Sequence, residues 1–152
     1  MIKRITNPEE FRNVINDIDI LFEDENKNAG HVFDLVHDKE TIINSFSNKQ
    51  ILAWDVFVWA NKEGEKYDAV GIFLNDKSVK FGIKIFVEFL WLSKNPKAGF
   101  KIFKEAVKFA RGENFKYMSV TSVEKHPNSQ KNKRLYKKLG FEKDSTTFIA
   151  TL

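Results

Sequence analysis

An acidic side chain inside an apolar run is the first feature of this sequence that could do chemistry. Glu88 lies in the middle of IFVEFLWL, residues 85–92. Burial disfavours the charged form of a carboxyl group and raises its pKa toward neutrality, where the group can accept and return a proton. Lys84 would lie on the same face of a strand, so a plain ion pair with Lys84 is the competing interpretation. The sequence leaves both open.

The next segment, SKNPKAGFK at residues 93–101, has the composition of an anion site. Three lysines supply positive charge, and Gly99 would let a ligand come close to the backbone. The segment joins a predicted strand to a helix predicted over 99–111. Helix starts carry free backbone N–H groups and partial positive charge, and they bind pyrophosphate. An ordinary solvated turn is the alternative, since neither GxxxxGK[ST] nor GxGxxG is present.

Hydrophobic periodicity predicts the elements that must position these residues. We expect strands at 2–6, 49–62, 67–75, 79–93, 115–123 and after 140, and helices at 8–24, 31–46, 99–111 and 129–139. The order is β-α-α-β-β-β-α-β-α-β. The strands between 49 and 93 form an antiparallel meander, and the strand–helix–strand unit over 79–123 makes its two strands parallel. The sequence thus predicts one α/β (α+β) domain over 1–152, with a mixed, mostly antiparallel central sheet of about six to seven strands and helices on both faces.

Local signals mark several boundaries. Asn7, followed by proline, is a candidate cap for the first helix, with Glu10 in the position of a capping box. Asp38 caps a further helix, a turn is expected at 75–78, and Gly112 and Gly140 end the two C-terminal helices.

Composition limits the classes of function. The 152 residues contain no cysteine, which excludes disulfides, thiolate metal sites and cysteine nucleophiles. The three histidines show no metal-ligand spacing, and we interpret them as surface residues, with no metal bound. There is no signal-peptide core and no apolar run near the ~18 residues of a membrane span, so we expect a cytoplasmic protein.

The net charge of +4 comes from dispersed lysines, without an arginine-rich stripe or an aromatic platform. That pattern disfavours a nucleic-acid partner and suits an anionic small ligand.

The stretch NSQKNKRLYKKLGF, residues 128–141, is more specific than its length suggests. Together with the 93–101 loop and its helix, it resembles the GNAT family of acyl-CoA-dependent N-acyltransferases over nearly the whole chain. The family loop reads R/Q-x-x-G-x-G/A, followed by Leu-Leu/Met and a later Ala. The corresponding residues here are Lys94, Gly99, Ile102-Phe103 and Ala110. Lys97 replaces the middle Gly, and the loop is a few residues shorter than usual.

The resemblance implies direct attack of a substrate amine on the thioester of acetyl-CoA. Tyr136 falls on the tyrosine that protonates the leaving thiolate, although a core role is the alternative for this residue. Glu88 is the candidate base, directly or through water. Backbone N–H groups over 97–101 and the splayed edge of the preceding strand hold the cofactor, and an N–H near Leu92 stabilises the oxyanion. The expected cofactor-binding residues are Trp91, Leu92, Lys94, Lys97, Ala98, Gly99, Phe100, Lys101 and Asn128.

Two functions from different classes follow from the resemblance. The first is an N-acetyltransferase that acts on a primary amine of a small molecule or a protein. The second is a GNAT-fold binding or assembly module without catalysis, suggested by Lys97 and the short loop. Family members are often dimers, and the sequence leaves the oligomeric state and the acceptor open.

Overall fold

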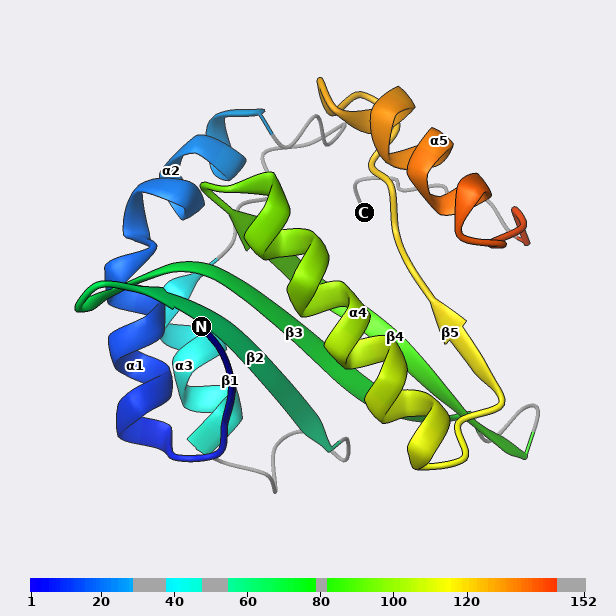
Figure 1. Ribbon diagram of the computed structural model, residues 1–152, viewed down its shortest axis with the longest axis horizontal. Coiled ribbons are helices and arrows are strands. Elements are labelled where there is room, and N and C mark those ends of the chain that lie inside the picture. Colours follow the sequence, from blue (N-terminus) through cyan, green and yellow to red (C-terminus); the bar gives the residue numbers. More distant parts are fainter. Residues whose placement is uncertain (29–37, 48–54, 79–81, 145–152) are drawn as a thin grey trace, which may run out of the picture.

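The computed structural model describes residues 1–28, 38–47, 55–78 and 82–144 (Figure 1). The elements follow one another as β1 (Ile2–Ile5), α1 (Pro8–Asp17), α2 (Asp19–Asn28), α3 (Lys39–Ser47), β2 (Val56–Glu63), β3 (Lys66–Ser78), β4 (Ile83–Ser93), α4 (Pro96–Gly112), β5 (Tyr117–Ser119) and α5 (Ser129–Lys138). No helix in these ranges is long and apolar enough to cross a membrane.

One mixed sheet holds the described strands in the order β1-β2-β3-β4-β5. The pairs from β1 to β4 are antiparallel and β4 pairs with β5 in parallel, so the predicted meander and the parallel unit are confirmed. The described strands number five, fewer than the predicted six to seven. Most of the predicted last strand, at 145–152, lies outside the described residues, as do 31–37 and 48–54, and 141–144 forms no strand.

Helices cover both faces of the sheet, as predicted. On one face α1, α2 and α3 bury an apolar cluster that includes Phe11, Val14 and Ile43. On the other face lies α4, which runs along the sheet in Figure 1 and packs through Ala98, Ile102, Ala106 and Ala110. Each cluster removes apolar area from water, which is the main stabilising term in folding.

A glycine allows α4 to approach the sheet closely. A Cβ atom at Gly71 would lie 2.6 Å from the side-chain Cγ2 of Ile102 and 2.9 Å from the ring of Phe73. The backbone of β3 is therefore in contact with the helix at this point.

The N-terminal helical region differs from the prediction of a single helix. It breaks at Ile18, whose side chain is fully buried, and continues as α2. Asn7 caps α1 as predicted by accepting bonds from the next N–H groups. Glu10 does not close a capping box: its carboxylate accepts hydrogen bonds from Lys3 and Tyr67 instead. Tertiary partners therefore outcompeted the local motif.

Of the other predicted boundaries, one is confirmed and two differ in the structure. The cap at Asp38 is confirmed by a 2.8 Å bond from the Thr41 N–H. No turn forms at 75–78, because β3 continues to its pairing with the start of β4. The strand predicted over 115–123 is reduced to Tyr117–Ser119.

Of the two predicted helix ends, one is confirmed and the other lies at a different residue. The stop at Gly140 is confirmed, with φ of +87°. The end of α4 is made by Asn114, which adopts φ of +60°, and not by Gly112, which is still helical.

Candidate active site

Strands β4 and β5 pair over a short stretch and then diverge. The pairing covers only residues 85–87 of β4, whereas β4 itself continues to Ser93 (Figure 1). No other described strand replaces β5 beside residues 88–93. Among the described residues, the backbone N–H and C=O groups on that side of β4 therefore have no partner strand, as at the edge of a sheet.

A β-bulge lies where the divergence starts. Ile72 of β3 pairs with Leu90 and Phe73 pairs with Glu88, so Phe89 is the extra residue. The bulge changes which side chains face which core: Phe86 packs in the α4 cluster, whereas Leu90 packs in the opposite one. This phase change explains why IFVEFLWL lacks a clean period of two. Bulges of this kind re-aim side chains and are frequent beside active sites.

Glu88, just before the bulge, is held by the segment that follows β5. Its Oε2 accepts a 3.2 Å hydrogen bond from the backbone N–H of Thr121. Burial raises the pKa of Glu88 to about 7, with a smaller contribution from the negative charge of Glu25, and the Thr121 bond opposes the shift. Glu88 forms no ion pair with Lys84, which is exposed. The carboxyl group can therefore take up and release a proton near neutral pH.

Tyr136, on α5, contacts the backbone of the same residue, Thr121. Its side chain is buried, and its Oη donates a 3.3 Å hydrogen bond to the carbonyl oxygen of Thr121. Burial, and after it the charge of Glu88, raise the pKa of Tyr136 above its ordinary value. The phenol is thus protonated at neutral pH and can donate. The structure thus brings Glu88 to the N–H and Tyr136 to the C=O of the same residue, Thr121.

The start of α4 is more self-contained than the sequence suggested. The helix begins at Pro96, three residues before the predicted 99, and Pro96 has no N–H. The N–H of Lys97 donates to Oδ1 of Asn95 at 3.0 Å, and that of Gly99 donates to the Asn95 carbonyl at 3.0 Å. Internal acceptors therefore engage several of the N–H groups predicted to bind pyrophosphate.

Gly99 has a packing reason to be glycine. A Cβ atom there would lie 3.0 Å from Cβ of Ser93 and 3.1 Å from Nε1 of Trp91. Trp91 donates a 3.0 Å hydrogen bond to the carbonyl of Gly99 and stacks on Phe103, with ring centroids 5.1 Å apart. The absence of a side chain at 99 thus lets α4 rest against the end of β4.

The other predicted cofactor residues fall into two groups. Exposed residues are Lys94, Lys97, Lys101 and Asn128, with Phe100 partly exposed beside Lys104. Buried residues are Ala98 and Leu92, whose side chain packs in the core on the α1 side. Leu92 can therefore offer a ligand only its backbone.

No protein-family model and no curated protein matches this chain. Solved structures do match it over its full length. A soil-metagenome aminoglycoside acetyltransferase, meta-AAC0020 in complex with sisomicin, superposes with a TM-score of 0.70 at 15% identity, covering 100% of this chain and 95% of that one. Ribosomal-protein-alanine N-acetyltransferase from Brucella melitensis biovar Abortus 2308 gives a TM-score of 0.69 at 7% identity, covering 100% and 98%.

A predicted acetyltransferase with acetyl-CoA from Clostridium acetobutylicum gives a TM-score of 0.67 at 12% identity, covering 99% of this chain and 95% of that one. The chain has the GNAT fold. At these identities the likeness concerns the fold, and the sites have to be argued from this chain's own residues.

The sequence did not predict three residues that lie near the point where β4 and β5 diverge. The backbone of Thr121 binds both Glu88 and Tyr136, and the negative charge of Glu25, on α2, raises the pKa of Glu88. His126, which we interpreted as a surface residue, is instead largely buried and hydrogen-bonded to Glu25 at 3.3 Å. These partners are 101 residues apart in the chain, so no local pattern could have joined them. His31 and His37 lie outside the described residues.

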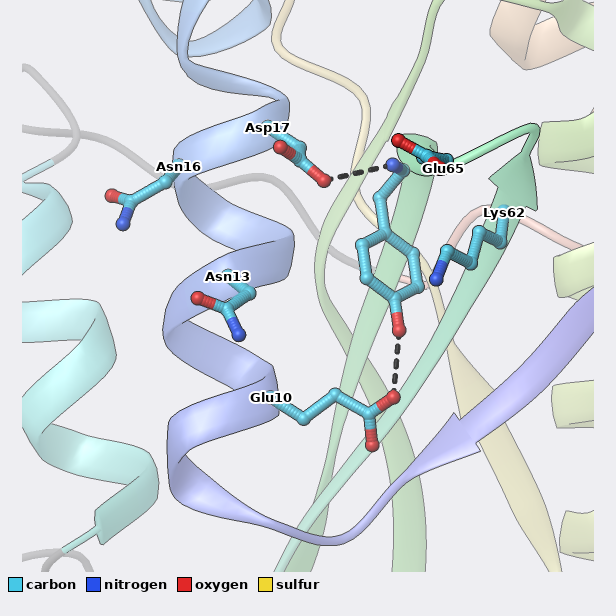
Figure 2. A pocket seen from close by; sticks show the side chains of 7 residues that line it. Glu10, Asn13, Asn16, Asp17, Lys62 and Glu65 are labelled. Atoms are coloured by element: carbon cyan, nitrogen blue, oxygen red, sulfur yellow. Dashed lines mark hydrogen bonds between the residues drawn. The ribbon is translucent and has the colours of Figure 1, made fainter.

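A separate pocket lies on the α1 side of this GNAT fold and contains none of the predicted site residues (Figure 2). Tyr67 lines this pocket, with its hydroxyl donating to Glu10 at 2.6 Å and its N–H donating to Asp17 at 3.0 Å. The remaining lining residues are Asn13, Asn16, Lys62 and Glu65. Burial and the Glu10 bond raise the pKa of Tyr67 to about 12, while bonds from Lys3 and Tyr67 lower the pKa of Glu10. Tyr67 hydrogen-bonds to both Glu10 and Asp17, so we interpret the pocket as a structural contact between α1 and β3.

Proposed function

We propose that the protein is an N-acetyltransferase that moves the acetyl group of acetyl-CoA to a primary amine by direct attack. The observation that carries this proposal is the backbone of Thr121, which binds Glu88 through its N–H and Tyr136 through its C=O beside the divergence of β4 and β5. The fold shared with acetyltransferases supports it.

Glu88 is suited to accept a proton and Tyr136 to donate one. An amine must lose a proton to attack, and Glu88, with a pKa of about 7, can accept that proton near neutral pH. The departing sulfur must gain a proton, and the phenol of Tyr136 stays protonated because its pKa is raised. A pair of groups whose environments favour opposite tasks is the usual pattern of acid–base catalysis.

Acetyl-CoA, when bound, would supply an activated thioester. This chain's residues fit such an anionic, amide-containing molecule. Exposed Lys94, Lys97 and Lys101 surround the positive end of α4, and the free side of β4 over 88–93 offers hydrogen-bonding groups. The Asn95 cap reduces the number of free N–H groups, so we assign more of the phosphate binding to the lysine side chains.

Titration of the purified protein with acetyl-CoA by calorimetry tests the first half of the proposal. We expect micromolar affinity that weakens with added salt, because lysine side chains bear much of the charge. Absence of binding at millimolar acetyl-CoA would overturn the proposal and favour a GNAT-fold module that binds a protein partner.

Release of free thiol from acetyl-CoA in the presence of amines tests the second half. The panel takes its members from the acceptors that two structural neighbours name: sisomicin and a peptide that begins with alanine. Spermidine adds a small flexible polyamine. We expect thiol release with one class of amine and not with the matched N-acetylated compounds.

A further inference from the structure

The segment over 120–128 carries Thr121 but belongs to no helix or strand. Its short-range bonds tie it to the start of α5. Ser122 Oγ lies 3.3 Å from Oγ of Ser129, and the N–H of Ser129 donates to the His126 carbonyl at 2.9 Å. These contacts shape the segment locally, but they do not fix its distance from β4 and from Glu88.

A hydrogen bond between His126 and Glu25 ties the segment to α2 in the N-terminal half of the chain. The Nε2 atom of His126 lies 3.3 Å from Oε2 of Glu25, and the two side chains are 14% and 25% exposed. The other ring nitrogen, Nδ1, accepts a 3.0 Å bond from the Asn128 N–H. Nδ1 is therefore unprotonated and Nε2 carries the proton that it donates to Glu25.

We propose that Glu25 and His126 are positioning residues, whose hydrogen bond holds the backbone of Thr121 in place between Glu88 and Tyr136. The bond joins α2 to the segment that follows β5, where β5 no longer pairs with β4. The catalytic part of this inference rests on the proposed function, whereas the mechanical part concerns the fold alone.

Glu25 has two separable effects on Glu88. Its carboxylate anchors the segment through His126, and its negative charge favours the protonated form of Glu88. The other groups that face Glu88 are the Thr121 N–H and Tyr136, while Lys84 on the same strand is exposed. A substitution that removes only the charge and one that removes only the bond should therefore have different signatures.

Two variants make this separation. His126→Asn retains a short side-chain acceptor for the Asn128 N–H but is too short to reach Glu25. Glu25→Gln retains an acceptor for the His126 proton but has no charge. Glu124→Gln is the control, because it removes an exposed ion pair with Lys133 from the same segment.

Amide hydrogen exchange of the full chain without ligand tests the mechanical part. We expect His126→Asn to speed exchange in the peptide over 120–128 by about tenfold or more, because local opening becomes easier. Glu25→Gln and Glu124→Gln should exchange like the parent protein. Unchanged exchange in His126→Asn would overturn the inference, whether or not the protein is an enzyme.

The pH dependence of thiol release, with acetyl-CoA and whichever amine of the panel reacts, tests the catalytic part. His126→Asn should lower kcat by about tenfold to a hundredfold while the KM for acetyl-CoA changes little, as expected for misplaced catalytic groups. Glu25→Gln should move the acidic limb of the profile to lower pH with a similar plateau. Glu124→Gln should change neither.

The two possible failures are distinguishable. If the parent protein releases no thiol with any amine, the proposed function fails and hydrogen exchange still decides the mechanical part. If the parent protein reacts and His126→Asn reacts equally well with an unshifted profile, the positioning role is wrong.

Discussion

Two regions flank the divergence of β4 and β5, and they are built differently. One is the α4 start, residues 95–99, where hydrogen bonds join residues two to eight apart in the chain. The other is the Thr121 junction, formed by Glu88, Thr121 and Tyr136, whose bonds span 33 and 15 residues. At the α4 start, N–H groups donate to acceptors within the same turn. In the Thr121 junction, burial raises the pKa of the Glu88 carboxyl group above its ordinary value.

This difference suits the α4 start to ligand binding and the Thr121 junction to proton transfer. A capped, packed helix start is stable by itself and offers a ligand shape and positive charge. A buried carboxyl group destabilises the folded state when it ionises, and such groups are retained where they have a function. Changes in the α4 start should therefore alter stability and cofactor affinity, and changes in the Thr121 junction should alter turnover.

Glu88→Gln should give the largest effect. We expect a loss of about a hundredfold or more in kcat/KM, the typical contribution of a general base. In the parent protein kcat/KM should fall as the pH drops through about 7, because Glu88 then becomes protonated. Acetyl-CoA affinity, measured by calorimetry, should stay near the parent value.

Stability gives an independent check on Glu88. Its folded pKa lies above the unfolded value, so only the folded state binds this proton between about pH 4.5 and 7. Stability should therefore decrease as the pH rises through that window, and Glu88→Gln should not show this decrease. Denaturant unfolding at pH 5 and pH 8 measures it, and identical pH dependence in the two proteins would contradict the raised pKa.

Tyr136→Phe should lower kcat by about tenfold or more, as expected for the loss of a general acid. Phenylalanine keeps the ring that packs on Phe141, with centroids 5.9 Å apart, so folding should be retained. Acetyl-CoA affinity should be nearly unchanged. An unaltered rate would remove Tyr136 from the chemistry and leave it as a core residue.

Gly99→Val tests the α4 start. The new side chain would crowd Ser93 and Trp91, so we expect a loss of about 1–3 kcal/mol in stability together with weaker acetyl-CoA binding. Gly112→Val, in the same helix but with open space around it, is the control. Equal stability losses in the two variants would mean that Gly99 does not hold α4 against β4.

Asn95→Ala should give the smallest effect, and Asn7→Ala is its matched control. Asn7 and Asn95 both cap a helix that begins with proline, so each alanine variant should lose about 1 kcal/mol in thermal or denaturant unfolding. Only Asn95→Ala frees the Lys97 N–H, and we expect it to bind acetyl-CoA about threefold to tenfold more tightly. Weaker binding in Asn95→Ala alone would indicate that the Asn95 side chain itself contacts the ligand.

Much of the fold was predictable because its signals act over a few residues. Asn7, Asp38 and Gly140 mark helix ends through bonds or backbone angles of their own turns, and the structure confirms all three. The antiparallel meander follows from short connections, and the parallel pair of β4 and β5 follows from the helix between them. One failure came from partners outside the local motif, because Glu10 accepts hydrogen bonds from Lys3 and Tyr67 and does not close the predicted capping box.

In the candidate site, too, residue types could be chosen from the sequence, whereas their contacts could not. The residue types at 88, 99 and 136 and the resemblance of their surroundings were sufficient to select them, because carboxyl, glycine and phenol groups have distinct chemistry. Tertiary structure alone decided that β5 leaves β4 after residue 87, that the bulge falls at Phe89, and that Thr121 joins Glu88 to Tyr136. It also brought His126 to Glu25. These features depend on where chain segments meet after folding, and sequence patterns act only within a turn or a strand pair.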